Sequence, residues 1–153
     1  MVWEQWTEQA LQTIAHARNE AQRLGDSQVC TEHLLLGILA EPDPQVKRLL
    51  EHFNIPLEKL RHDIDRNIQP AIPFAQTAAS AGKPELPLAM RSIHVTDLAE
   101  NEAYLSGSTL VHPAHVLLAL IRDGEGLAGR ILLNLGASQT EEARQLVSHG
   151  ISA

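Results

Sequence analysis

The sequence contains one cysteine, Cys30, in 153 residues. A single cysteine cannot form a disulfide within the chain, so nothing requires an oxidising compartment. No apolar run reaches the roughly 20 residues of a membrane-spanning helix, and the longest is Leu34–Ala40. The N-terminus shows neither the basic nor the apolar segment of a secretory signal. We therefore expect a cytoplasmic protein without a membrane partner.

Clusters of basic residues are also missing. The chain has 12 Lys and Arg against 19 Asp and Glu, a formal net charge of −7, and its basic residues are scattered. Because phosphate contacts require clustered Lys and Arg, this composition argues against a nucleic-acid partner. Aromatic residues make up only 3%. The apolar residues are mostly Leu, Ala, Ile and Val, which predicts an all-α protein of helices packed on helices.

The chain is long enough to fold as one domain over residues 1–153. At this size about 68–70% of the surface of the unfolded chain can be buried. Neither a metal, a disulfide nor a cofactor is needed to complete such a core. We accordingly predict no metal site and no cofactor.

An internal repeat organises the sequence. At an offset of 82 residues, the segment 6–60 matches 88–142 without a gap, and 11 of 55 positions are identical. The identities cluster: 19–21 matches 101–103, and 35–36 matches 117–118. Fixed-period self-similarity marks a duplicated structural unit. We therefore predict two pseudo-twofold-related four-helix repeats: repeat one at 6–67, a proline-containing linker at 68–87, and repeat two at 88–147.

Capping residues and apolar spacing predict four helices in each repeat. The first repeat is expected to have helices over 8–24, from Thr31, from Pro44 and from about Pro56. The second is expected to have helices over 88–105, 113–121, 127–135 and 141–147, the last of them with a capping box at Ser138–Glu141. The second helix of each repeat is apolar nearly all round, so Leu35 and Leu117 should be fully buried.

Two sequence motifs resemble a known family. Residues 20–25 read EAQRLG and residues 31–39 read TEHLLLGIL, while residues 123–128 read DGEGLA. This order resembles the double Clp repeat of the Clp N-terminal domain, found in ClpC- and ClpA-type AAA+ unfoldases and in stand-alone Clp accessory proteins. The resemblance implies a non-catalytic module that binds adaptors, substrates or Clp ATPase and protease subunits. It also allows the plastid stroma as the compartment, if the chain comes from a plant.

The resemblance also implies a binding site. In ClpC-like members the glutamate of the TEH motif lies at a pocket for phosphoarginine side chains, which places Thr31 and Glu32 at such a site here. Repeat two has Pro113 and Ala114 instead, so its carboxylate is missing. In related domains an N-terminal aromatic helps to line an apolar groove between the repeats, so Trp3 is a further candidate.

Two alternatives remain open at this stage. The chain could be the excised N-domain of a full Clp ATPase. It contains no GxxxxGK[ST] phosphate loop, because Pro84 follows Gly82-Lys83 and no glycine precedes them at the required spacing. A reading from another class is a small metal- or thiol-dependent enzyme, whose candidate residues are Cys30, His33, His112 and His115.

Overall fold

The structure is a computed structural model that describes residues 3–68, 86–138 and 141–152, with Trp3 and 149–152 described by their backbone alone. Every helix or strand within these ranges is helical, and no strand occurs there. The predicted all-α fold is confirmed. Most of the predicted linker 68–87, and the middle of the predicted capping box at Ser138–Glu141, lie outside the described residues.

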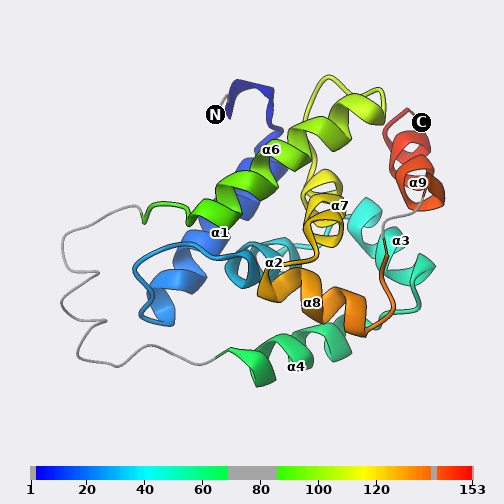
Figure 1. Cartoon of the computed structure of the whole chain (residues 1–153). Helices are drawn as coiled ribbons and strands as arrows, with labels where there is room; N and C mark the ends of the chain where they lie inside the picture. Colours follow the sequence, from blue (N-terminus) through cyan, green and yellow to red (C-terminus); the bar gives the residue numbers. More distant parts are fainter. Residues whose placement is uncertain (1–2, 69–85, 139–140, 153) are drawn as a thin grey trace.

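The described residues form eight α-helices and one 3-10 turn (Figure 1). Repeat one comprises η1 (Trp3–Gln5), α1 (Glu8–Arg23), α2 (Thr31–Ala40), α3 (Pro44–His52) and α4 (Leu57–Asn67). Repeat two comprises α6 (Met90–Leu105), α7 (Pro113–Asp123), α8 (Leu127–Asn134) and α9 (Glu141–Ser152). The predicted helices are therefore present, with differences of a few residues at their ends.

Side-chain caps and left-handed residues set several helix boundaries. The Thr7 hydroxyl accepts a hydrogen bond from the Ala10 amide at 3.1 Å, and Asp43 accepts one from the Val46 amide at 2.8 Å. These are the N-caps that the sequence predicted for α1 and α3. Gly107 has a φ of 79° just after α6, a conformation that side chains with a Cβ rarely adopt.

Two short backbone pairings link the repeats. Trp6 pairs with Val111, and Val29 pairs with Leu88, as isolated parallel bridges. The two bridges are related by the 82-residue offset, since each joins the entry of one repeat to the loop before the second helix of the other. This pairing explains why α6 begins at Met90 and not at the predicted Leu88: the backbone at Leu88 is extended to reach Val29.

Helices α2 and α7 form the centre of the core. Leu35 on α2 and Leu117 on α7 are both completely buried, as predicted. Gly37 allows α2 to approach α1 closely, because a Cβ built at this glycine would lie only 2.3 Å from the carbonyl oxygen of Thr13. A larger residue there would have to push the two backbones apart.

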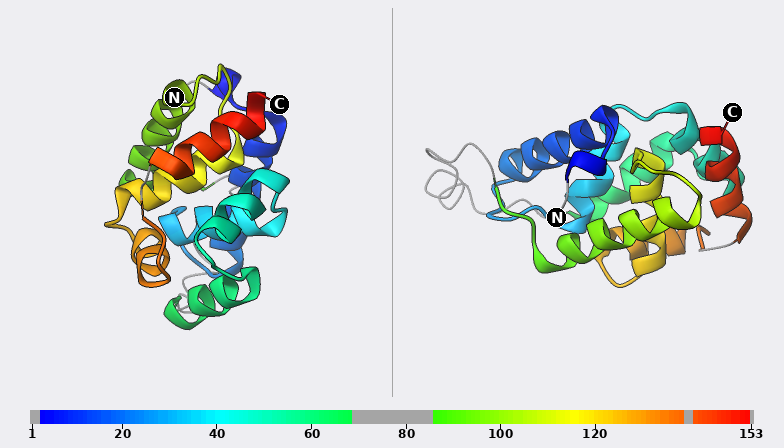
Figure 2. Two further views of the ribbon diagram at one scale, coloured as in Figure 1. Left: turned by 90° about the vertical axis from the view of Figure 1, so that its right-hand side faces the viewer. Right: turned by 90° about the horizontal axis from the view of Figure 1, so that it is seen from above.

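The outer helices pack across the repeats as well as within them. α4 packs against α2 of its own repeat and α8 of the other, and α9 packs against α7 of its own repeat and α3 of the other. Figure 2 shows α9 alongside α7, on the side away from α4. The two repeats are thus interlocked around one shared core, with the last helix of each covering the third helix of the other.

The 82-residue register changes by one residue before the last helix. Ile55 and Ala137 are both buried and both donate their amide across equivalent turns, at the original offset. In the last helices, however, buried Leu60 corresponds to buried Ala143. Repeat two has therefore gained one residue between α8 and α9, and side chains of α9 match those of α4 at an offset of 83.

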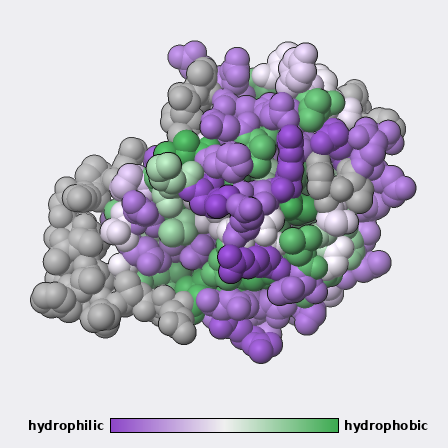
Figure 3. Space-filling model, in the orientation of Figure 1, coloured by the Kyte–Doolittle hydropathy of each residue, from purple (hydrophilic) through white to green (hydrophobic). Residues whose placement is uncertain are grey.

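The surface is mostly hydrophilic. On the face shown in Figure 3, hydrophobic residues form small patches that hydrophilic residues separate. Among the residues that the structure describes, no helix is long and apolar enough to cross a membrane.

Candidate functional site

The N-terminus of α2 carries the predicted site in repeat one, and a histidine fixes its geometry. The Nδ1 atom of His33 accepts a hydrogen bond from the Cys30 amide at 2.8 Å. Its Nε2 atom lies 2.8 Å from Oδ2 of Asp26. Because Nδ1 accepts, the ring proton must sit on Nε2 and point at that carboxylate. His33 is fully buried and is fully used in holding the loop before α2.

Thr31 joins the two repeats at this site. Its hydroxyl oxygen accepts a hydrogen bond from the Ala128 amide at 3.3 Å, so it caps the first turn of α8 from the other repeat. The N-cap residue of α8 is Gly126, which has no side chain to do this. A Cβ at Gly126 would lie 2.6 Å from the Thr31 hydroxyl oxygen. Thr31 is only 3% exposed, and its hydroxyl is used within the fold.

Glu32 is the acidic group of this site that faces solvent. It lies in the first turn of α2 and is half-buried. Burial raises the pKa of the Cys30 thiol to about 11, and the nearby carboxylates of Glu32 and Asp26 add to that shift. A catalytic thiol requires a lowered pKa, so the surroundings of Cys30 are the opposite of those of a nucleophile.

The equivalent place in repeat two has different chemistry. Ala114, which occupies the position of Glu32, is completely buried. The neighbouring His112 lines a pocket of about 350 Å³ together with Asp43 of the other repeat. Burial lowers the pKa of His112, and the charge of Asp43 opposes this shift. The only carboxylate described in this pocket comes from the start of α3, and the helix that follows His112 contributes none.

The histidine of repeat two has lost its acidic partner. The Nδ1 atom of His115 accepts from the His112 amide at 2.9 Å, as in repeat one. Ser108 stands where Asp26 stands in repeat one, and the buried Nε2 atom of His115 has no hydrogen-bond partner among the described residues. Burial lowers the pKa of His115 to about 3, and the neighbouring His112 contributes to the lowering.

The third candidate residue, Trp3, begins η1, but its side chain lies outside the described residues. Its neighbour Gln5 lines a pocket of about 280 Å³ together with Tyr104 of α6. Tyr104 is 78% exposed, and Leu110 nearby in sequence is 41% exposed. Exposed apolar side chains are therefore present close to η1.

The four residues of the enzyme alternative do not form one site. Cys30 and His33 flank the start of α2, whereas His112 and His115 flank the start of α7. Within the described ranges, no group of three or more His, Cys, Asp or Glu side chains is arranged to hold a metal ion. Each histidine of the TEH position instead bonds the backbone of its own loop, which is a structural role.

The contact between repeats was not predicted from sequence. The glycine pair of 123–128 and the threonine of the TEH motif were both recognised as motif residues, yet nothing in one sequence shows that they touch. The signal that could have found the contact is the missing N-cap: a helix that begins after Gly126 leaves amides to be satisfied from elsewhere.

The family model described as the Clp repeat (R) N-terminal domain matches residues 5–135. The chain belongs to this family. It is a Clp N-domain, and the match includes α1–α4 and continues through α8. The predicted resemblance is confirmed.

Curated relatives agree with this assignment. The chain is 34% identical over 146 residues to the chloroplastic chaperone protein ClpC of Pisum sativum, covering 95% of this chain and 15% of that protein. It is 35% identical over 147 residues to the ATP-binding subunit ClpC of the ATP-dependent Clp protease of Staphylococcus aureus, covering 96% and 17%. The chain thus spans less than a fifth of the length of these relatives.

Solved structures share the fold. The N-terminal domain of the chaperone ClpD from Arabidopsis thaliana matches with a TM-score of 0.68 and 24% identity, covering 100% of this chain and 98% of that chain. The N-terminal domain of Hsp104 from Candida albicans matches with a TM-score of 0.72 and 18% identity, covering 97% and 91%. At these identities the similarity establishes the fold of the Clp N-domain and nothing further.

Proposed function

We propose that this Clp N-domain is a non-catalytic protein-binding module of the Clp protease system. Its role would be to bind adaptors, substrates or Clp subunits, and so to regulate or deliver substrates for ATP-dependent proteolysis. The observation that carries the proposal is the family match over 5–135, together with relatives that are Clp ATPases and chaperones. The compartment that fits these relatives is the bacterial cytoplasm or the plastid stroma.

Two forms of this proposal use the same surface. The domain may act by itself as an accessory protein, or it may be the front part of a full Clp ATPase. Both forms need a partner protein to approach the N-terminus of α2 or the surface next to η1. Neither requires any bond to be made or broken by this domain.

Glu32 is the residue that we propose to carry the acidic site. It is half-buried in the first turn of α2, and Thr31 holds this turn against α8. A carboxylate held in place in this way can accept two parallel hydrogen bonds from a guanidinium group. We therefore propose Glu32 as the contact for an arginine-derived side chain such as phosphoarginine, with Thr31 as a positioning residue.

Repeat two would contribute little to this recognition. Ala114 is completely buried where Glu32 is partly exposed. Restoring a carboxylate by Ala114→Glu would force a charge into the apolar interior, which is costly without a partner. We propose one acidic site per chain, with Trp3 and the apolar surface beside η1 as a separate contact for partners.

Affinity capture tests the proposal. The immobilised domain is incubated with lysate of the source organism, and bound Clp ATPases, protease subunits and adaptors are quantified by mass spectrometry. Wild type and Glu58→Gln should enrich such proteins, and Glu32→Gln should enrich them less. Glu58 is a matched control, because it is an exposed glutamate in the first turn of another helix. Capture of no Clp-system protein by any of the three would contradict the proposal.

A further inference from the structure

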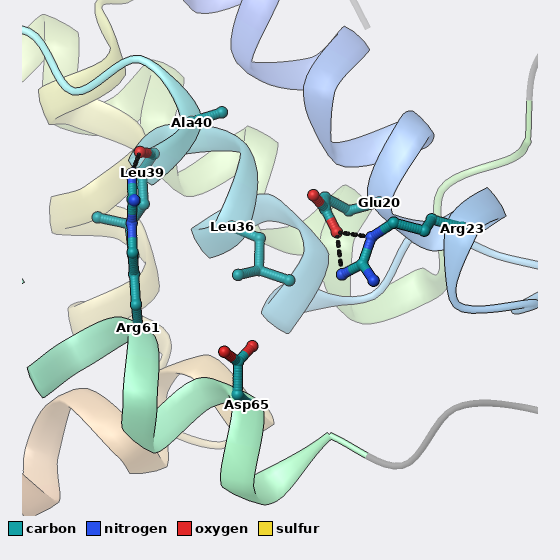
Figure 4. Close-up of a pocket in the computed structure, with 7 residues that line it drawn as sticks. All are labelled: Glu20, Arg23, Leu36, Leu39, Ala40, Arg61 and Asp65. Carbon is teal, nitrogen blue, oxygen red and sulfur yellow. Dashed lines mark hydrogen bonds and ion pairs between the residues drawn. The ribbon is translucent and has the colours of Figure 1, made fainter. Parts of the chain in front are cut away.

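A pocket of about 330 Å³ opens between α1, α2 and α4, away from Glu32 (Figure 4). Glu20 and Arg23 reach it from α1, Arg61 and Asp65 reach it from α4, and Leu36 of α2 lies between them. This volume is at the lower end of the roughly 300–1,000 Å³ of small-ligand pockets. The pocket is therefore suited to a single long side chain.

Repeat two shows what fills the same place. Glu102 corresponds to Glu20 at the 82-residue offset, and it is completely buried. Arg144 of α9 clamps it through two bonds, from Nε to Oε2 at 2.9 Å and from Nη2 to Oε1 at 3.2 Å. Arg122 of α7 adds a longer contact of 3.5 Å. A buried carboxylate is stable when guanidinium groups pair with it in this fork geometry.

Repeat one has the carboxylate without this clamp. The position of Arg122 is held by Ala40. The counterpart of Arg144, one residue further along as established for the last helices, is Arg61. Arg61 does not bond Glu20 but donates to the carbonyl oxygen of Leu39, at the end of α2 (Figure 4). The space between Glu20 and Arg61 is the pocket.

The partner that Glu20 does have is exchangeable. Arg23 lies one turn further along α1 and donates to Oε2 of Glu20 from Nε at 2.9 Å and from Nη2 at 2.6 Å. The side chain of Arg23 is 62% exposed and that of Glu20 is 30% exposed. Exposed pairs within one helix contribute little stability, because water screens them. Glu20 can therefore change partners at small cost.

We propose that this pocket binds an arginine side chain of a partner protein, which pairs with Glu20 as Arg144 pairs with Glu102. The aliphatic part of the ligand would lie over Leu36, as long basic side chains commonly bury their stems. Asp65 supplies a second negative charge on the α4 side. The formal net charge of −7 favours the approach of a basic segment.

This inference rests on the proposed function, that the domain binds proteins, but it uses a different acid from Glu32. An acidic ligand is disfavoured, because the pocket's guanidinium groups are already hydrogen-bonded, Arg23 to Glu20 and Arg61 to Leu39. The filled counterpart in repeat two is likewise a guanidinium group. The pocket thus corresponds to an internal arginine site that repeat one has left open.

A titration followed by amide chemical shifts in NMR spectra tests the inference. The probe is acetyl-Gly-Arg-Gly-amide, which carries no phosphate, and the matched peptide has citrulline in place of arginine. The arginine peptide should shift the amides of 20–23, 36–40 and 61–65. The citrulline peptide, which is neutral and of nearly the same shape, should bind about tenfold more weakly or worse, because the charged fork is lost.

Three variants sharpen the test. Glu20→Gln should weaken the arginine peptide by about tenfold or more, since it removes the charge from the acceptor. Ala40→Arg should weaken it similarly, because it rebuilds the arrangement of Arg122 and fills the pocket from within. Glu8→Gln is the control, an exposed acid on α1 that should leave binding unchanged. All three positions are at the surface, and thermal unfolding confirms that each variant folds.

The outcomes separate this inference from the proposed function. Shifts that gather at the start of α2 and depend on Glu32 but not on Glu20 would overturn the arginine pocket and leave the proposed function standing. Equal binding of the citrulline peptide, no shifts at the named amides, or an Ala40→Arg variant that binds normally would also overturn it. Failure of the Clp-system capture leaves the peptide titration unaffected, since the peptide is tested alone.

Discussion

The unpaired imidazole of repeat two gives the sharpest stability prediction. Ser108→Asp should stabilise the domain, because it would supply His115 with the carboxylate that His33 has in repeat one. The backbone is already equivalent: the amides of Asp26 and Ser108 each donate to the carbonyl 5 residues earlier, both at 2.9 Å. In repeat one this geometry brings the carboxylate to 2.8 Å from Nε2 of the histidine.

The magnitude follows from two opposing contributions. A hydrogen bond between a carboxylate and the buried N–H of His115 contributes about 1.5–3 kcal/mol. Ser108 donates from its hydroxyl to the carbonyl oxygen of Leu110 at 2.6 Å, and losing this exposed bond costs about 0.5–1.5 kcal/mol. The net gain in unfolding free energy should be about 1 kcal/mol, which raises Tm by about 2–4 °C for a chain of this size.

Urea and thermal unfolding followed by circular dichroism measure this gain. Ser108→Asn is the matched control, since it has the shape of the aspartate without the charge and should gain less. The reciprocal change Asp26→Ser should destabilise repeat one by about 1–3 kcal/mol, because it leaves the buried N–H of His33 unpaired. If Ser108→Asp destabilised the domain while Asp26→Ser had no effect, the assigned role of these histidines would be wrong.

The same histidine predicts the sign of a pH dependence. The pKa of His115 is about 3 in the folded domain, against 6.5 for the free side chain. Between these values the unfolded chain binds a proton that the folded chain does not, so stability falls as the pH falls below 6.5. At pH 5 the loss should be about 2 kcal/mol. Ser108→Asp should reduce this loss, because a nearby carboxylate raises the pKa of His115.

Further predictions concern the core and the contact between repeats. Leu35→Ala and Leu117→Ala should each lower the unfolding free energy by about 2–5 kcal/mol, and urea unfolding that shows less than about 1 kcal/mol for both would contradict the central placement of α2 and α7. Gly37→Ala should cost about 1–3 kcal/mol, since its Cβ would lie 2.3 Å from the carbonyl oxygen of Thr13; an unchanged Tm would refute this close approach. Thr31→Val keeps the shape of the side chain but leaves the first turn of α8 without its acceptor, so it should cost about 1–3 kcal/mol, and Thr31→Ser should retain most of that stability.

Local signals in the sequence were sufficient for most of the fold. Thr7 and Asp43 are strong caps, and the apolar faces of the second helices identify Leu35 and Leu117 as core. The internal repeat then predicts repeat two from repeat one. These features depend on neighbouring residues or on the duplication itself, so one sequence contains them.

Contacts that depend on tertiary packing could not be predicted in this way. Thr31 was expected at a ligand pocket, and its hydroxyl caps α8 of the other repeat instead. The extended backbone at Leu88 is set by Val29, 59 residues away in sequence. The one-residue change of register before α9 lies beyond the ungapped match, so the correspondence of Arg61 with Arg144 emerges only from the packed helices.

The site itself is predicted from sequence only through the family. No spacing or composition distinguishes Glu32 from another acid in a first helical turn, such as Glu58. What the structure adds is asymmetry: Glu32 is partly exposed and Ala114 is completely buried. This difference is what makes a single acidic site per chain a testable claim.

Calorimetric titration with a phosphoarginine peptide tests the proposed site most directly. Wild type and Glu58→Gln should bind the peptide weakly with one site per chain, and Glu32→Gln should weaken binding by about tenfold or more, since a charged hydrogen bond is lost. Two equal sites in the wild type, or binding that is indifferent to Glu32, would contradict the account.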